Sequence, residues 1–209
     1  MNVAEQTLQV RETLENEMSH YGVAASSEAL DGLVQYYQLL NAWNQRLHLV
    51  SFHSAAEFAT RHVLESLFLL KFFPRAAHVV DVGSGGGLPI IPCLIVRADL
   101  RAVLVEAARK KTVFLNEVLG RTSTKERAQV IGDRFENVGI PEVDFLTCRA
   151  LERFQTMLPR LTKWAPVPGT MLLFGGDGLG RAIKNLGLAN EKILLPNSAR
   201  RFLFIIKKI

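Results

Sequence analysis

Glycines and an acidic residue occur together near the middle of this chain, in a pattern typical of a loop that binds a charged ligand. The run "VVDVGSGGGLPIIP", residues 79–92, has four glycines in five residues, and the first of them lies two positions after Asp81. Glycine lets the backbone approach a ligand closely and adopt a positive φ. Loops of this kind bind phosphates, dinucleotides or S-adenosylmethionine, and the spacing of the glycines distinguishes among them.

The spacing argues against the first two ligands. A phosphate-binding loop requires Lys and then Ser or Thr after its last glycine, whereas Leu88 follows Gly87. A dinucleotide-binding loop reads G-x-G-x-x-G, and its third glycine would fall on Leu88. The chain instead reads G-x-G-x-G through Gly83, Gly85 and Gly87. This register favours S-adenosylmethionine, which has no pyrophosphate to hold.

Residues at three predicted strand ends complete the expected cofactor site. Asp81 would balance the charges of the ligand, directly or through water. Glu106 lies 23 positions after Gly83, where an acidic residue can accept hydrogen bonds from both ribose hydroxyls. Phe135 and Glu136 follow the third strand and would flank the adenine. Taken singly, each has an ordinary structural explanation: a tight turn, a solvated strand end or a core phenylalanine. Their occurrence at successive strand ends predicts the cofactor site.

Hydrophobic periodicity predicts the elements that position these residues. The first 73 residues are predicted to be helical, and Pro74 ends that region. Strands then alternate with helices, which is typical of a parallel sheet with right-handed crossovers. The predicted strands are 77–82, 101–107, 128–133, 143–150, 168–176, 191–196 and 200–208, and the predicted helices are 88–97, 110–121 and 152–165.

The last two strands have no long helix between them, so they are expected to form an antiparallel hairpin at one edge of the sheet. The predicted fold is therefore an α/β, Rossmann-like class I methyltransferase fold with a mostly parallel seven-stranded sheet. An N-terminal helical region, residues 1–74, would precede a methyltransferase domain, residues 75–209, in one compact unit.

Composition narrows the class of protein. The chain has 209 residues, of which 48% are apolar and 22% charged, as in an ordinary globular protein. Its formal net charge of +5 is compatible with a nucleic-acid partner. Cys93 and Cys148 are the two cysteines, and we expect neither a disulfide nor a metal site, with Cys148 structural. Without a signal peptide or a long apolar run, the protein is expected to be cytoplasmic, and a monomer is the simplest expectation.

The chain resembles the bacterial small-subunit (16S) ribosomal RNA guanine-N7 methyltransferases, also called glucose-inhibited division protein B, from about Tyr36 to Lys207. The segments that carry the resemblance are "LLNAWNQRLHLVS", "RHVLESL", "VVDVGSGGGLPIIPCLI", "EAARKKTVFLNEV", "TCRAL" and "RRFLFIIKK". Many methyltransferases share the glycine motif, but the R-H-x-x-E-S and C-R-A segments are far more specific.

The resemblance implies contacts between S-adenosylmethionine and five residues: Gly83, Leu88, Phe135, Glu136 and Arg149. It also implies methylation of guanine N7, a reaction that requires no catalytic acid or base, so that Arg149 has a positioning role.

The chain departs from the pattern of this family at several positions. Glu65 replaces an aspartate, Leu49 a threonine, Ile90 a small residue and Phe174 a lysine. The resemblance implies an RNA contact by that lysine, which this chain lacks.

Basic residues are the candidates for binding RNA. Arg109, Lys110 and Lys111 open the second helix of the sheet region, where cations oppose the helix dipole unless that face meets an anion. Arg61 and His62 lie on the N-terminal helix that would roof the cofactor site, although His62 also fits a packing role. A small-molecule methyltransferase, a non-catalytic binding module and an NAD-dependent oxidoreductase are the alternative functions, and Leu88 disfavours the last.

Overall fold

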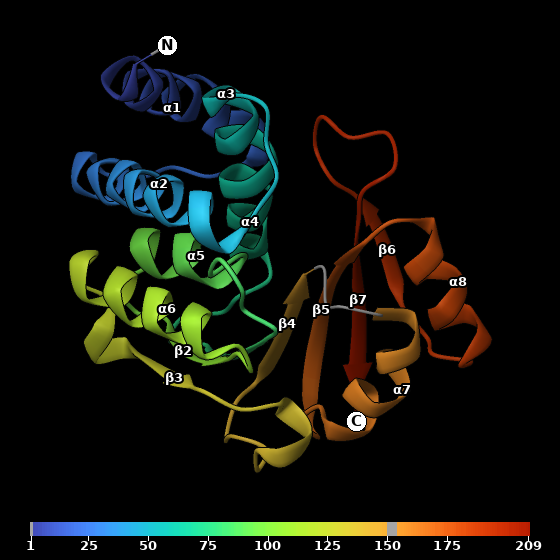
Figure 1. Ribbon diagram of the computed structural model, residues 1–209. Coiled ribbons are helices and arrows are strands. Elements are labelled where there is room, and N and C mark those ends of the chain that lie inside the picture. Colours follow the sequence, from blue (N-terminus) through green and yellow to red (C-terminus); the bar gives the residue numbers. More distant parts are fainter. Residues whose placement is uncertain (1, 150–153) are drawn as a thin grey trace.

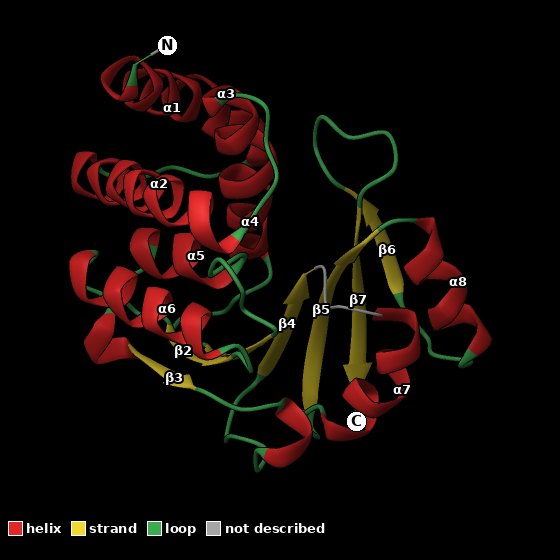
Figure 2. Ribbon diagram, viewed as in Figure 1, coloured by secondary structure: helices red, strands yellow, loops and turns green. Residues whose placement is uncertain are grey.

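The computed structural model describes residues 2–149 and 154–209, which form a sheet covered by helices on both faces (Figure 1). The N-terminal helices and α5 and α6 cover one face, and α7 and α8 cover the other. Figure 2 shows that the strands form the middle layer of this arrangement. The expected α/β fold is confirmed.

The sheet has seven strands in the order β3-β2-β1-β4-β5-β7-β6. Their bounds are β1 His78–Val82, β2 Arg101–Val105, β3 Ala128–Ile131, β4 Phe145–Arg149, β5 Gly169–Gly175, β6 Glu191–Leu194 and β7 Phe202–Lys208. The first five strands are parallel, whereas β7 is antiparallel to both β5 and β6. The predicted C-terminal hairpin is thus confirmed, with β7 inserted between β5 and the edge strand β6.

The chain before the sheet is helical, as predicted, but it is divided into several segments. These are α1 Val3–Glu17, η1 Met18–Tyr21, α2 Ser27–Leu47, α3 Ala55–Glu57, η2 Phe58–Leu64, α4 Glu65–Leu67 and η3 Phe68–Lys71. The segment η2 is a π-helix inside an otherwise continuous helical stretch from α3 to η3. Ser54 caps this stretch by accepting a hydrogen bond from the Glu57 N–H at 3.1 Å.

Four longer helices connect the strands: α5 Ile90–Val96, α6 Arg109–Arg121, α7 Phe154–Trp164 and α8 Asp177–Asn185. The sequence pattern did not indicate α8, because Gly178 and Gly180 lower its helix propensity. Burial of Leu179 and Ile183, one turn apart, stabilises it against the sheet. Residues 150 and 152–153 of the predicted fourth strand and third helix lie outside the described residues.

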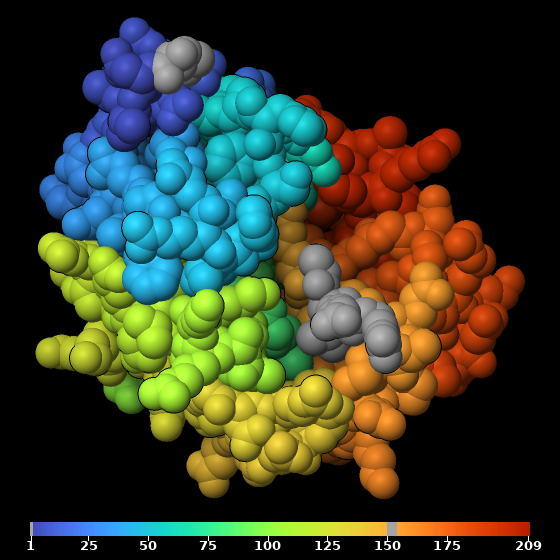
Figure 3. Space-filling view, in the orientation of Figure 1, coloured from blue at the N-terminus to red at the C-terminus, as the bar shows by residue number. Residues whose placement is uncertain are grey.

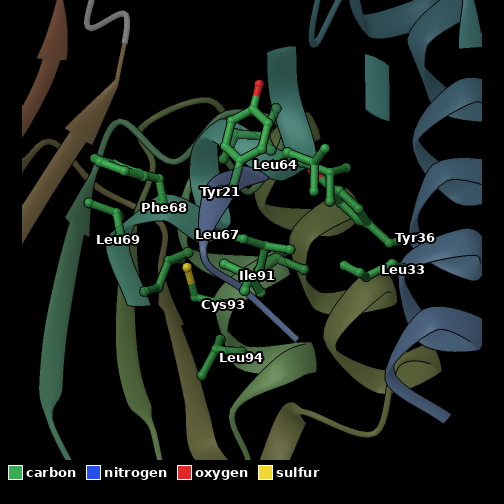
Figure 4. Packing of buried hydrophobic residues seen from close by; sticks show 14 of the residues in the cluster. Tyr21, Leu33, Tyr36, Leu64, Leu67, Phe68, Leu69, Ile91, Cys93 and Leu94 are labelled. Carbon is green, nitrogen blue, oxygen red and sulfur yellow. The ribbon is translucent and has the colours of Figure 1, made fainter. Parts of the chain in front are cut away.

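Strand side chains alternate between two apolar layers. Val79 of β1 faces the N-terminal helices, whereas Val80 and Val82 face α7 and α8. The same alternation directs Asp81 toward the N-terminal helices. Figure 4 shows this larger layer, in which side chains of α2, α4 and α5 interdigitate.

The N-terminal helices share their core with the sheet region. One continuous apolar cluster includes Leu33 and Leu64 from the N-terminal helices together with Val79, Ile91 and Leu104 from the remainder of the chain. The division into regions 1–74 and 75–209 stays a prediction, but this packing supports its description as one compact unit.

Candidate functional site: the carboxyl edge of the sheet

The glycine loop follows β1 and has the backbone geometry that its spacing predicted. Gly83, Gly85 and Gly87 have φ values of 72°, 53° and 84°, a region that side chains rarely adopt. At Gly87 a Cβ atom would also overlap the side chain of Ile91. The G-x-G-x-G register therefore corresponds to three positions at which the backbone requires glycine.

Glu106, just beyond the end of β2, holds this loop in place. Its Oε2 accepts a hydrogen bond from the Gly85 N–H at 2.8 Å, and its Oε1 accepts one from the Ala108 N–H at 2.8 Å. Each carboxylate oxygen has two acceptor sites, so these bonds leave capacity for a ligand hydroxyl. The residue predicted to bind ribose thus also orders the glycine loop.

Tyr36, in the region that the sequence predicts to be helical, is a residue of this site that sequence reasoning missed. Its hydroxyl donates a hydrogen bond to the Gly86 carbonyl oxygen at 2.7 Å, and the whole side chain is buried. The helical spacing of the apolar residues in α2 indicates that Tyr36 faces inward, but it gives no sign of which carbonyl the hydroxyl meets. Packing of α2 over the loop creates this contact.

Asp81 is fully buried beneath the glycine loop. Its Oδ1 accepts a hydrogen bond from the Thr147 hydroxyl at 2.8 Å, across the register pair between β1 and β4. Its Oδ2 is buried and has no hydrogen-bond partner among the described residues. Burial raises the pKa of Asp81 to about 7, a change that the nearby hydroxyls of Ser84 and Thr147 oppose. The carboxyl group therefore titrates near neutral pH.

Arg149 ends β4 on the same face of the sheet, two residues after Thr147. Its Nη2 donates to the carbonyl oxygen of Arg61 at 2.7 Å and to Oε2 of Glu65 at 3.1 Å. Phe174, its register neighbour on β5, lies against the guanidinium, with the Arg149 carbon Cζ 5.5 Å from the ring centre. Phe174 therefore packs against the Arg149 cation, at the position where the family that this chain resembles has a lysine.

The structure leaves two buried atoms of opposite character unpaired at this edge. Nη1 of Arg149, like Oδ2 of Asp81, is buried without a hydrogen-bond partner among residues 2–149 and 154–209. Unpaired buried polar atoms are costly, and they commonly mark groups that a ligand or water satisfies. One acceptor and one cationic donor suit the ammonium and carboxylate groups of a zwitterionic amino acid, such as the methionine end of S-adenosylmethionine.

The residues predicted to flank the adenine lie beside the end of β3, in the short helix η5 Phe135–Asn137. The ring of Phe135 is only 4% exposed and packs edge-on against Trp164, with 5.6 Å between ring centres. Glu136 forms an ion pair with Arg160 at 3.5 Å. Leu88 is buried directly after the glycine loop. Adenine stacking on Phe135 stays a prediction, and the ring's present contacts are those of a core side chain.

The candidate RNA-binding residues fall into two places. Arg109, Lys110 and Lys111 form the first turn of α6, next to Glu106, and the capping residue Ala108 offers no side-chain hydrogen bond to this turn. Arg61 is exposed and pairs with Glu57.

His62 packs against Phe58, and its Nε2 donates a hydrogen bond to the Ser51 carbonyl oxygen at 3.1 Å. Burial lowers the pKa of His62 to about 4, so the ring is neutral at pH 7. These contacts favour the packing role for His62.

A cavity of about 570 Å³ opens beside Arg149, at the carboxyl ends of β4 and β5. Phe174, Leu179 and Leu195 provide apolar wall, and Glu65 and Arg201 provide charge. Figure 3 shows the surface hollowed between the green segment that carries the glycine loop and the orange C-terminal half. The carboxyl edge of the sheet is where open α/β sheets bind ligands.

Neither a metal site nor a membrane-spanning helix is found in the described part of the chain. No group of three or more His, Cys, Asp or Glu side chains there is arranged to hold a metal ion. Cys93 and Cys148 are both buried. Among the described residues, no helix combines the length and the apolar character needed to cross a membrane.

Comparison with protein families gives one match that covers most of the chain. The family model described as "rRNA small subunit methyltransferase G" matches residues 29–193. Among curated proteins, "Ribosomal RNA small subunit methyltransferase G" of Anaeromyxobacter dehalogenans is 33% identical over 83% of this chain and 80% of its own length. The protein of the same name from Pelotomaculum thermopropionicum is 32% identical over 95% of this chain and 90% of its own length.

Solved structures of much lower sequence identity share the fold. An O-methyltransferase from Bacillus cereus, in complex with S-adenosylhomocysteine, matches with a TM-score of 0.58 at 15% identity, over 89% of this chain and 93% of its own. An S-adenosylmethionine-dependent methyltransferase from Aquifex aeolicus matches with a TM-score of 0.54 at 14% identity, over 68% of this chain and 89% of its own. At these identities the likeness concerns the fold.

Proposed function

Since the chain belongs to the rRNA small subunit methyltransferase G family, we propose that it methylates guanine N7 at one position of small-subunit (16S) ribosomal RNA, with S-adenosylmethionine as methyl donor. The structural observation that carries the proposal is that Oδ2 of Asp81 and Nη1 of Arg149, both buried at the carboxyl edge of the sheet, have no hydrogen-bond partner in the described part of the chain. A zwitterionic ligand end satisfies both atoms, whereas a phosphate or a dinucleotide satisfies the cation alone.

In this proposal each site residue has one task. Gly83, Gly85 and Gly87 let the backbone curve around the ligand, and Leu88 closes the loop. Asp81 and Arg149 hold the charged groups of the methionine end, and Glu106 accepts hydrogen bonds from the ribose hydroxyls. Phe135 and Glu136 border the adenine.

The chemistry places few demands on the protein. S-adenosylmethionine supplies the methyl group from its sulfonium centre, and the electrons of the broken C–S bond remain on sulfur. Guanine N7 has a lone pair and no proton, so the chain needs no general base. Its residues contribute by fixing the two reactants in line, and such positioning supplies up to about 7–11 kcal/mol in the best intramolecular models.

The acceptor guanine would enter from the cavity beside Arg149. This cavity adjoins the proposed methionine end and combines the ring of Phe174 with polar groups. Arg109, Lys110 and Lys111, at the same edge of the sheet, would contact RNA phosphates, and Arg61 and His62 belong to the segment that roofs the site. We infer a monomer, because all of these residues come from one chain, and a cytoplasmic protein, because ribosomal RNA is the proposed substrate.

A methyl-transfer assay tests the proposal. Labelled S-adenosylmethionine is offered with small ribosomal subunits that lack N7-methylguanosine and, separately, with their naked RNA. We expect label in at least one substrate, at a position that borohydride and aniline cleave as N7-methylguanosine. Cofactor binding without any labelled RNA would overturn the proposal in favour of a small-molecule methyltransferase or a non-catalytic binding module. Lys125→Ala, at the opposite edge of the sheet, is the matched control variant and should retain full transfer.

A further inference from the structure

Glu65 of α4 is a buried carboxylate at the centre of the site. It is 1% exposed, and both of its oxygens bind arginines. Oε1 accepts a hydrogen bond from Nε of Arg201 at 2.6 Å, and Oε2 accepts one from Nη2 of Arg149 at 3.1 Å. A carboxylate is buried at such a position only when it is paired, so these two bonds account for its presence.

The bonds of Glu65 connect three distant parts of the fold. Arg149 ends β4, and Arg201 ends the loop of residues 195–201 that joins β6 to β7. This loop is the red segment at the top of Figure 1, at the same edge of the sheet as the end of β4. Glu65 therefore fixes the position of Arg149 relative to the roof of the cavity.

The contacts of Arg149 restrain its guanidinium on one side only. Nη2 carries both hydrogen bonds, to Glu65 and to the Arg61 carbonyl oxygen, and the ring of Phe174 lies near the guanidinium carbon. A guanidinium is planar and rigid, so holding one nitrogen and the plane also sets the direction of the other nitrogen. That other nitrogen is Nη1, which has no partner within the described residues.

The charges of Glu65, Arg149 and Arg201 do not cancel. Two arginines share one carboxylate, and the neighbouring His62 is neutral because burial lowers its pKa to about 4. Within residues 2–149 and 154–209, these three side chains thus carry an excess positive charge, on arginines that are 15% and 34% exposed. A ligand anion at Nη1 would balance it.

We propose that Glu65 is a positioning residue of the methyl-transfer site: clamped between Arg149 and Arg201, its carboxylate aims Nη1 of Arg149 at the carboxylate of the bound cofactor. The inference rests on the proposed function, in which Arg149 holds that group. Glu65 touches neither reactant and acts through Arg149. Without its negative charge the two arginines repel one another, and Arg149 loses the contact that sets its orientation.

A double-mutant cycle tests this role. The dissociation constants of S-adenosylmethionine and S-adenosylhomocysteine are measured by calorimetry for the wild type, Glu65→Gln, Arg149→Ala and the double variant, at a temperature where thermal unfolding shows all four folded. We expect Glu65→Gln to weaken binding about tenfold in the wild-type background and less than about twofold in the Arg149→Ala background. A residue with a merely structural role would weaken binding equally in both.

Further variants keep the test decisive if Glu65→Gln folds poorly. Arg201→Ala removes the second anchor at a partly exposed position, and we expect it to weaken binding about threefold, again only when Arg149 is present. Glu65→Asp retains the charge but shortens the side chain, and its effect should be intermediate. Glu57→Gln is the matched control: it removes a carboxylate that pairs with Arg61 on the same helical stretch, and cofactor binding should be unchanged.

Two outcomes separate the inference from the function on which it rests. Additive effects of Glu65→Gln and Arg149→Ala, in a chain that binds cofactor and methylates ribosomal RNA, would overturn the positioning role alone. A wild-type chain that binds no S-adenosylmethionine would overturn both.

Discussion

The hydroxyl of Tyr36 donates a hydrogen bond to the carbonyl oxygen of Gly86 across 2.7 Å, which joins helix α2 directly to the glycine loop. The two residues are 50 positions apart in the sequence. The N-terminal helices therefore do more than cover the sheet, because one of them holds the backbone that we expect to contact the cofactor.

Replacing Tyr36 by Phe should weaken both the fold and the cofactor site. The change leaves the buried Gly86 carbonyl without its donor, which costs about 1–3 kcal/mol of unfolding free energy. Urea unfolding measures that loss, and calorimetry should show weaker S-adenosylmethionine binding. Tyr37→Phe is the matched control, because the Tyr37 hydroxyl donates instead to Gln6 at 3.3 Å, away from the loop. Equal losses of cofactor affinity in the two variants would contradict a role of Tyr36 in the loop.

Replacing Gly87 by Ala should damage the loop far more than an alanine elsewhere. At a φ of 84° a side chain is strained, and the new Cβ would overlap Ile91, so we expect a loss of more than about 1 kcal/mol together with weak cofactor binding. Gly120→Ala in α6 provides the comparison, because no atom of the described residues outside its chain neighbours and its own helix backbone lies within 4 Å of its Cβ position. That variant should be neutral or more stable, by up to about 1 kcal/mol. Thermal unfolding of the two variants measures this difference in stability.

The buried carboxyl group of Asp81 should make folding stability depend on pH. In the unfolded chain Asp81 loses its proton near a pKa of about 4, whereas burial raises its pKa in the folded chain to about 7. Its contribution is therefore complete below pH 4 and is lost as pH rises to 7, a change on the order of 4 kcal/mol. Asp81→Asn cannot ionise, so its stability relative to the wild type should increase over this interval. Urea unfolding of both proteins at pH 4.5 and pH 7.5 measures this change. A difference in unfolding free energy that is the same at both pH values would contradict the shifted pKa.

Binding of the cofactor should release a proton from Asp81. A cationic ammonium group near Oδ2 favours the charged carboxylate and lowers its pKa below the value of about 7 in the free protein. Between the two pKa values the carboxyl is protonated before binding and ionised after it. Calorimetry at pH 6.5 in buffers of different ionisation enthalpy measures the released proton. If Asp81→Asn still releases a proton on cofactor binding, that proton comes from another group.

The first turn of α6 should determine how binding of ribosomal RNA depends on salt. Alanine at Arg109, Lys110 and Lys111 removes three cations, so binding should weaken and the slope of log K against log salt should become less steep by about 2–3. Filter binding at several salt concentrations gives this slope. Lys125→Ala is the control for Lys110→Ala, because Lys125 lies before β3 at the opposite edge of the sheet. The salt slopes of these two single variants are compared. Equal slopes for these two would argue against an RNA contact at α6.

Much of the fold was predictable because it depends on local patterns. The alternation of short apolar strands with helices identified the parallel sheet, and the short link before β7 identified the hairpin. Helix α8 escaped this reasoning, because its glycines disfavour a helix locally and its stability comes from packing against the sheet. The π-helical turn η2 has the sequence of an ordinary amphipathic helix, so no local pattern distinguishes it.

The sequence by itself determined the register of the glycine loop and the positions of Asp81, Glu106 and Arg149, since parallel strands bring their carboxyl ends to one edge. Only the tertiary structure decided that Glu106 binds the loop backbone, that Tyr36 reaches Gly86, and that Glu65 pairs with Arg149 and Arg201. The physical reason is distance along the chain. The strands along the chain follow from periodicity, whereas these contacts join residues 21 to 136 positions apart. Those of Tyr36 and Glu65 depend on how the N-terminal helices pack on the sheet.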